Sequence, residues 1–138
     1  MRAASRAGGS RRPTSQETLD RREGYIRLQG RAVFKFAVSA IHSVVHELLG
    51  KHGYTVDDLD LFVPHQANLR IIQAAVDKLG IPMERVISTV ERHGNTSSAS
   101  IPMALDEAVR SGRLKSGDLT CLVAFGGGLT WGGALLRW

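Results

Sequence analysis

Two short and mostly apolar segments, Leu59–Val63 and Leu119–Phe125, constrain the fold of this chain more than any other feature. Neither is long enough for a buried helix, and neither alternates regularly between apolar and polar residues. This pattern is typical of strands that are buried on both faces. Amphipathic helical patterns precede and separate the two segments. The sequence therefore predicts an α/β fold in which helices and strands form layers.

Apolar residues that recur every three or four positions predict three helices. The first covers Arg31–Lys51 and the second covers Ala67–Leu79. The third ends at Arg110, and either Thr96 or Ser97 can cap its start. The apolar stripe of the first helix consists of Val33, Phe36, Ala37, Ala40, Ile41, Val44, Val45 and Leu48.

Two further strands are predicted from the remaining apolar segments. One is Val86–Val90, between the second and third helices, and the other is Leu129–Trp138 at the end of the chain. The glycines of Gly126–Gly128 predict a tight turn before this last strand, so the chain should close with an antiparallel hairpin. The expected order is helix, strand, helix, strand, helix, strand, strand, with a mixed sheet.

The composition indicates one soluble globular domain. The 138 residues are 43% hydrophobic and 22% charged, and no apolar run reaches the roughly 18 residues of a membrane helix. A single cysteine excludes an internal disulfide framework and favours a reducing compartment. We therefore expect a cytoplasmic protein without a membrane segment.

The first 23 residues differ from the rest of the chain. They contain six arginines and three acidic residues, which gives a net charge of +3. The whole chain has a net charge of +5, so residues 24–138 have a net charge of only +2. That small excess gives no indication of nucleic-acid binding. Residues 1–16 lack large apolar side chains and are expected to form a disordered lead, with a basic arm or a transit-peptide-like segment as the alternatives. A short helical turn is expected at 17–23, and the folded domain at 24–138.

Two neutral polar residues follow predicted strands, and both can donate hydrogen bonds. His65 comes directly after Leu59–Val63, and Asn95 follows Val86–Val90 after a glycine. Two neutral donors at strand-to-helix junctions are suited to holding an oxygen that develops negative charge. The spacing alone makes this a candidate oxyanion site.

Three other features have plainer interpretations. His42 and His46 lie one helical turn apart near His52, but on the polar face of a helix, which favours solvated histidines over a zinc site. Gly126–Gly128 precedes a strand rather than the helix that a phosphate-binding loop requires. That turn suits backbone N–H groups that bind an oxyanion as well as it suits a plain hairpin. Cys121 lies inside a predicted buried strand and is expected to be a small core residue.

Three ordered motifs narrow the interpretation. They are Val-Pro-His-Gln-Ala-Asn at 63–68, Arg-His-Gly-Asn-Thr-Ser at 92–97, and Ala-Phe-Gly-Gly-Gly-Leu-Thr-Trp-Gly at 124–132. Together they closely resemble the C-terminal half of β-ketoacyl-acyl-carrier-protein synthase III, the condensing enzyme that starts bacterial type II fatty-acid synthesis. The resemblance covers about residues 8–138. It implies a thiolase-like fold, in which two similar α/β halves pack as layers and usually form a homodimer.

The resemblance also implies a reaction. In this family a cysteine takes an acyl group from acyl-CoA, and malonyl on acyl carrier protein then decarboxylates and attacks that thioester in a Claisen condensation. The substrates are CoA and carrier-protein thioesters, and no cofactor or metal is implied. By similarity, His65 and Asn95 would donate hydrogen bonds to the malonyl thioester carbonyl, and the backbone N–H of Gly127 would be a further oxyanion contact.

Other family sites correspond to residues around these two donors. The pantetheine tunnel corresponds to Gly30, Asn68 and Phe125. The basic face that binds the acidic acyl carrier protein corresponds to Lys35, Arg70 and Lys78.

The family's nucleophilic cysteine belongs to an N-terminal half that nothing in this chain matches, so the isolated chain is not expected to form an acyl-enzyme. Cys121 lies in the wrong motif to replace it. Three interpretations stay open. The chain is a catalytic half completed by an N-terminal synthase half, an inactive remnant that binds a carrier protein or a synthase subunit, or part of a related polyketide-type condensing enzyme. In each case exposed apolar surface should drive dimerisation or aggregation.

Overall fold

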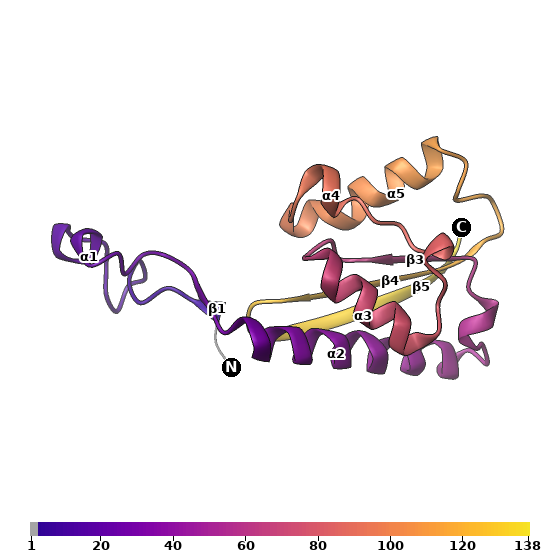
Figure 1. The fold of residues 1–138 in the computed structure, drawn as a ribbon, viewed down its shortest axis with the longest axis horizontal. Helices are drawn as coiled ribbons and strands as arrows, with labels where there is room; N and C mark the ends of the chain where they lie inside the picture. The colour runs from indigo at the N-terminus through magenta and orange to yellow at the C-terminus, as the bar shows by residue number, and fades with distance from the viewer. Residues whose placement is uncertain (1–2) are drawn as a thin grey trace.

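The computed structural model describes residues 3–138, which form helices and strands in the order that Figure 1 shows. The helices of four or more residues are α1 (Gln16–Asp20), α2 (Gly30–Lys51), α3 (Leu69–Leu79), α4 (Val90–His93) and α5 (Ser100–Arg110). The strands are β1 (Ala3–Ala4), β2 (Arg27–Leu28), β3 (Leu61–Pro64), β4 (Leu119–Gly126) and β5 (Thr130–Arg137). Short 3-10 turns are η1 (Val56–Asp58), η2 (Met83–Arg85) and η3 (Ser97–Ala99).

The main sheet contains three strands in the order β3-β4-β5. β3 runs parallel to β4, with Leu61 opposite Thr120, and β5 returns antiparallel to β4, with Gly126 opposite Thr130. The sheet is therefore mixed and closes with a hairpin, which confirms the α/β prediction and the last strand.

Helices cover both faces of this sheet, so the body has three layers (Figure 1). Phe62 of β3 belongs to the core cluster formed with α2 and α3, whereas its neighbours Leu61 and Val63 belong to the cluster formed with α5. Successive residues of a strand point to opposite faces, and all four residues of β3 are buried. Both faces of β3 are thus covered, as its apolar sequence predicts.

The predicted strand Val86–Val90 is wrong. The structure pairs this segment with β3 through one isolated bridge, between Phe62 and Val86, and the chain then enters α4. The reason is the side chain of Gln66. Its amide nitrogen donates to the carbonyl of Ile87 at 3.0 Å, and its carbonyl oxygen accepts from the N–H groups of Thr89 at 2.8 Å and Val90 at 3.1 Å.

The start of the third helix also differs from the prediction. α5 begins at Ser100 after the turn η3, and neither Thr96 nor Ser97 caps it with a side chain. Instead, the side-chain oxygen of Asn95 accepts a hydrogen bond from the N–H of Ser97 at 3.0 Å. That bond satisfies a backbone donor ahead of the helix, which is the usual task of a cap.

Residues 3–28, which we call the arm, reach away from the body (Figure 1). β1 pairs with β2, and Ser15 caps α1 by accepting from the N–H of Thr18. Thr18 is buried, and Glu23 forms an ion pair with Arg12 at 2.8 Å. The arm therefore differs from the disordered lead that its composition suggests, because capping and charge pairing replace an apolar core. The expected helical turn is present as α1, although it starts one residue earlier.

α2 has the length and apolar composition of a membrane-spanning helix, and it is the one described helix that does. It lies against the sheet and α3, where Ala37, Ile41 and Val45 are almost completely buried. Five residues of the predicted stripe are buried, whereas Val33, Phe36 and Leu48 are partly buried and Leu49 is buried in addition. These contacts account for its apolar residues within the fold.

Gly133 lets β5 approach α2 closely. A Cβ atom at this position would lie 2.7 Å from the carbonyl oxygen of Leu122 and 2.7 Å from Cγ1 of Val44. At the neighbouring Gly132 a Cβ would meet nothing within 4 Å. Two adjacent glycines of one strand thus have very different surroundings.

Replacing Gly133 with alanine is expected to lower the free energy of unfolding by about 1–3 kcal/mol, because the strand has to move away from α2. Gly132→Ala is the matched control and should stay within about 0.5 kcal/mol of the wild type. Urea unfolding followed by circular dichroism measures both. Equal losses in the two variants would contradict the close approach of β5 to α2.

Gln66→Leu is expected to lower the free energy of unfolding by about 3 kcal/mol, because each buried polar group left unpaired costs about 1–3 kcal/mol. Gln66 is 0% exposed, whereas Gln73 on α3 is exposed, which makes Gln73→Leu the control. The same urea titration compares them. A loss no greater than that of the control would show that the Gln66 amide does not hold the 87–90 segment.

Candidate active site

The candidate site lies where two parallel strands end. His65 follows β3 directly, and its backbone N–H donates to the backbone carbonyl of Val123 on β4 at 2.7 Å. Phe125 stands near the end of β4, and its ring lies 5.6 Å from the His65 imidazole in an edge-to-face arrangement. The carboxyl ends of parallel strands form the crevice in which α/β proteins commonly bind ligands.

A cavity of about 620 Å³ opens at this edge. It is bordered by the first turns of α2 and α3, by the 65–68 segment, by the loop after α4 and by the β4–β5 turn. Eight of the nine site residues predicted from the sequence line it, namely His65, Asn95, Gly127, Gly30, Asn68, Phe125, Lys35 and Arg70. Segments that are far apart in the chain therefore meet around one space.

His65 is held as a neutral imidazole. Its Nδ1 lies 2.6 Å from the hydroxyl oxygen of Ser100, the first residue of α5. Burial lowers the pKa of His65 below its ordinary value of 6.5, since the surroundings disfavour the charged ring. At neutral pH the side chain can therefore donate one hydrogen bond without carrying a charge.

Asn95 lies in the loop between α4 and η3, which is a helix-to-turn junction rather than the predicted strand end. Its Oδ1 accepts from the N–H of Ser97 at 3.0 Å. This bond orients the amide and leaves its NH₂ group as the part that can donate to a ligand. Together with His65, the cavity wall thus offers two neutral donors.

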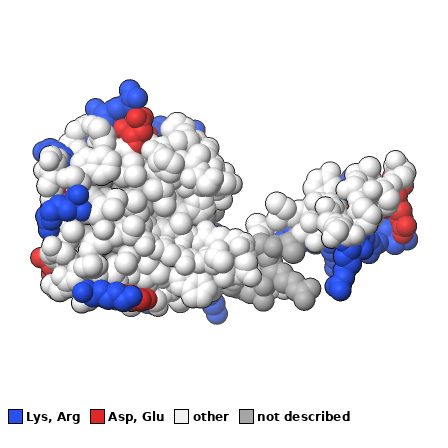
Figure 2. All heavy atoms as spheres, turned by 180° about the vertical axis from the view of Figure 1, so that it is seen from behind, with Lys and Arg blue, Asp and Glu red and all other residues white. Residues whose placement is uncertain are grey.

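Positive charge borders the same cavity. Arg31, Lys35 and Arg70 line it, and none of the described lining residues is acidic. In the view of Figure 2, the charged side chains that are visible on the body lie near the edge of its outline. The cavity wall is therefore suited to a negatively charged ligand or partner.

Lys78 does not reach this cavity. It lies in the last turn of α3, two turns beyond Arg70, and close to His42 on α2. Burial, His46 and Lys78 all lower the pKa of His42. The expected basic face therefore has two cations at the cavity and one further along α3.

Asn68 also has a structural task. Its side-chain oxygen accepts from the N–H of Arg70 at 2.9 Å and so caps α3, which begins at Leu69 rather than at Ala67. Its amide nitrogen stays available to the cavity. A helix cap alone accounts for an asparagine here, and its position on the cavity wall adds a second use.

Ser100 and Gln66 are the residues that sequence reasoning misses. Ser100 contacts His65 across 35 positions of the chain, and Gln66 bonds to residues 21 to 24 positions away. No local pattern marks Ser100, since Ser97 and Ser98 precede it in a similar context. For Gln66 the available signal is a long polar residue directly after a buried strand.

The remaining candidates behave as their plainer interpretations predict. Cys121 lies in β4 and is 0% exposed, and burial raises the pKa of its thiol to about 12. It is therefore a core residue and not a thiolate nucleophile. Among the described residues no group of three or more His, Cys, Asp or Glu side chains could hold a metal ion. The absence of a metal or cofactor in the functioning protein stays a prediction.

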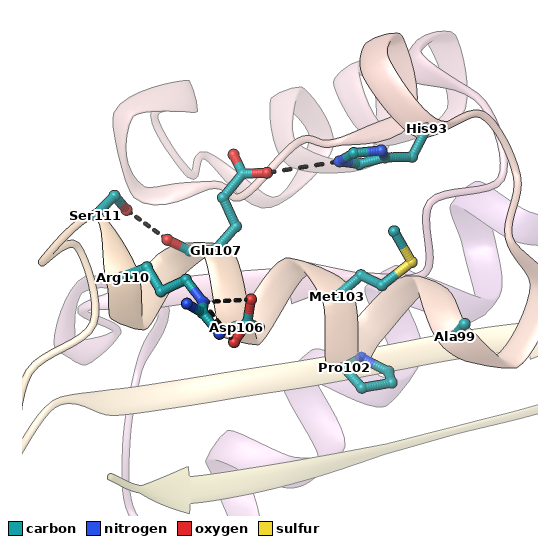
Figure 3. Close-up of a pocket in the computed structure, with 8 residues that line it drawn as sticks. All are labelled: His93, Ala99, Pro102, Met103, Asp106, Glu107, Arg110 and Ser111. Carbon is teal, nitrogen blue, oxygen red and sulfur yellow. Dashed lines mark hydrogen bonds and ion pairs between the residues drawn. The ribbon is translucent and has the colours of Figure 1, made fainter.

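A larger cavity of about 840 Å³ lies along α5 and includes His93 at the end of α4 (Figure 3). There Glu107 pairs with Arg92 and approaches Nε2 of His93 at 3.9 Å, which ties the end of α4 to α5. It holds none of the nine predicted site residues. The smaller cavity, with both neutral donors on its wall, is the candidate active site. The larger cavity is lined by His93, Ala99, Pro102, Met103, Asp106, Glu107, Arg110 and Ser111.

Comparison with known proteins decides the family. The sequence profile described as 3-oxoacyl-[acyl-carrier-protein (ACP)] synthase III C terminal matches residues 49–138. The chain belongs to the 3-oxoacyl-[acyl-carrier-protein] synthase III family. All three motifs that carry the resemblance lie inside the matched range, so the inference drawn from them is confirmed.

Similar proteins give the same family and fold. The β-ketoacyl-[acyl-carrier-protein] synthase III of Symbiobacterium thermophilum is 52% identical over 132 residues, which are 96% of this chain and 40% of that protein. The crystal structure of the synthase III of Thermus thermophilus has a TM-score of 0.81 and 55% identity, covering 83% of this chain and 36% of that one. The priming β-ketosynthase of the R1128 polyketide pathway has a TM-score of 0.73 and 43% identity, covering 83% and 35%.

These matches define how much of a synthase is present. The chain has the thiolase-like α/β fold of the family's C-terminal region. It spans 35% to 40% of the length of the curated relatives that it matches. The Symbiobacterium match, at 132 residues, also extends into the arm.

The lowered pKa of His65 makes stability depend on pH. The unfolded chain binds a proton at the ordinary value of 6.5, while the folded chain binds it only at lower pH. The free energy of unfolding should therefore be highest above pH 6.5 and fall as the pH drops below 6.5. Urea unfolding at several pH values measures this, and His65→Gln should flatten part of the slope. The pKa of His42 is also lowered, so His42 makes the free energy of unfolding depend on pH in the same direction and part of the slope should remain. A slope that His65→Gln leaves unchanged would contradict the assignment to His65.

Proposed function

We propose that this chain is the C-terminal catalytic half of a 3-oxoacyl-acyl-carrier-protein synthase III. In this proposal it takes part in the decarboxylative condensation of acyl-CoA with malonyl-acyl carrier protein in fatty-acid biosynthesis. One observation carries the proposal. His65, Asn95 and the turn at Gly127 come from three separate motifs and border a single cavity.

The proposed chemistry uses neutral donors because of the charge that develops. When malonyl thioester loses carbon dioxide, the electrons of the breaking C–C bond form an enolate, and negative charge builds on the thioester oxygen. Donors that are fixed in place stabilise that oxygen more than the ground-state carbonyl, so the barrier falls. Neutral His65 and Asn95 can both donate to it. The carbon of the enolate then attacks the carbonyl carbon of an acyl thioester on a cysteine supplied by the N-terminal half. A C–C bond forms, the C–S bond breaks, and the cysteine leaves as a thiolate.

The residues that line the cavity are the basis for proposing thioester substrates carried on a pantetheine arm. Gly30, Asn68 and Phe125 are proposed to line the tunnel of that arm, next to the donors. Lys35 and Arg70 stand on the same wall and are proposed to contact the acidic carrier protein. Lys78 would extend this contact along α3 only if the partner reaches two helical turns beyond Arg70.

Exposed apolar side chains support association with other subunits. Tyr25 and Ile26 of the arm are 68% and 74% exposed, and Trp131 on β5 is 53% exposed. We propose that an N-terminal synthase half and a second copy cover such surfaces, with the assembled enzyme in the cytoplasm. The CoA and carrier-protein thioesters are proposed as substrates, and no cofactor is proposed.

A polyketide-type condensing enzyme is the second candidate. The similarity to a priming β-ketosynthase favours it, since that protein shares 43% of aligned residues with this chain. Both candidates need the same donors for the same carbon–carbon bond. We propose that they differ in the acyl groups that an N-terminal half would accept.

The proposal is tested with a chimera in which this chain replaces the corresponding C-terminal part of the Thermus thermophilus synthase III. His65→Ala and Asn95→Ala should each lower kcat by about 10²–10³-fold, as losses of oxyanion donors do. Condensation of acyl-CoA with malonyl-acyl carrier protein is the measured reaction. His46→Ala, on the exposed face of α2, is the control and should retain activity.

Undiminished activity of the double variant in an active chimera would overturn the assignment of the two donors. An inactive chimera that still binds acyl carrier protein, with affinity that falls as salt rises, would favour a binding module instead. Such binding should then depend on Lys35 and Arg70.

A further inference from the structure

Ser100 has an unusual environment for a serine at the start of a helix. It is 2% exposed, and its hydroxyl oxygen lies 2.6 Å from Nδ1 of His65. Within the part of the chain that the structure describes, this is the one side-chain hydrogen bond that Ser100 makes. The nearby carbonyl of Thr96 already accepts from the N–H of Ala99, and that of Ser97 accepts from the N–H of Ser100 itself.

The contact allows two arrangements of hydrogen, and they have opposite consequences for the cavity. In one, the Ser100 hydroxyl donates to Nδ1, so the proton of the neutral ring sits on Nε2. In the other, Nδ1–H donates to Ser100, and Nε2 presents a lone pair. A lone pair repels a developing oxyanion, whereas Nε2–H stabilises it.

The two arrangements differ in whether the buried O–H group of Ser100 has a hydrogen-bond acceptor. If Nδ1–H were the donor, the buried O–H of Ser100 would have no acceptor within reach among the described residues, and an unmade buried donor is costly. If the hydroxyl donates, its hydrogen is satisfied, and Nε2–H is the ring donor that remains free on a side chain lining the cavity. The N-terminus of α5, which is positive, also disfavours a proton on the nitrogen that faces it.

We propose that Ser100 is a positioning residue, whose hydroxyl donates to Nδ1 of His65 and thereby keeps the imidazole in the Nε2–H form that an oxyanion requires. The inference rests on the proposed function for the role of that proton. The tautomer itself is a property of this chain alone. Ser100 touches neither the proposed substrate nor the reacting atoms, and it acts through His65.

The test is long-range ¹H–¹⁵N correlation of the histidine rings in this chain at pH above 7, with His65→Gln used to assign the signals. The wild type should show a protonated Nε2 and an unprotonated Nδ1 for His65. In Ser100→Ala the ratio of this tautomer to the other should fall by roughly five- to tenfold, the worth of one hydrogen bond. Ser98→Ala, which removes an exposed hydroxyl two residues earlier, should leave the ratio unchanged.

A wild-type His65 that carries its proton on Nδ1 would overturn the inference, even if Ser100→Ala failed to fold. So would an unchanged tautomer ratio in a folded Ser100→Ala. Ser100→Thr keeps a hydroxyl, and restoration of the wild-type ratio in it would support a donor role over packing. These outcomes do not depend on activity. A correct tautomer combined with an active His65→Ala chimera would refute the proposed function and leave the positioning by Ser100 intact.

Discussion

The buried amide of Gln66 is the interaction on which the rest of the site depends. It lies one residue after His65, and its oxygen and nitrogen bind the backbone of Ile87, Thr89 and Val90. The same nitrogen donates to the carbonyl of Pro64 at 2.8 Å. One side chain therefore joins the end of β3 to the segment that leads through α4 to Asn95. Because its partners are backbone groups and most of them are buried, it cannot move without leaving several of them unpaired.

Around that joint the protein combines two kinds of electrostatics. The donors His65 and Asn95 are neutral, and burial keeps the imidazole so by lowering its pKa. The cations Lys35 and Arg70 stand on the same cavity wall. Neutral donors can respond to charge that appears only during the reaction, while fixed cations attract a partner that is already anionic. The same cavity wall therefore combines neutral donors with fixed positive charge.

The length of the chain and its exposed apolar side chains support the proposal that it packs against another protein unit. The chain spans 35% to 40% of the length of its curated relatives. Its one cysteine is buried in a strand and is a core residue rather than a nucleophile. Its arm and its edge strand β5 expose large apolar side chains such as Ile26 and Trp131. A layered α/β unit that spans part of its relatives' length and exposes large apolar side chains is suited to packing against another unit.

The sequence by itself determined the α/β class, the helices α2, α3 and α5, the buried strands β3 and β4, and the closing hairpin. The helices have an apolar period of three to four residues, the two strands are short apolar runs, and glycines mark the turn of the hairpin. It also determined the family, through three ordered motifs. Only the tertiary structure decided that Val86–Val90 is not a strand, since a side chain from another segment takes up its backbone groups. It likewise decided that Asn95, rather than Thr96 or Ser97, satisfies the backbone before α5. The contact of Ser100 with His65 joins residues 35 positions apart, and the periodicity of a sequence carries no record of such long-range hydrogen bonds.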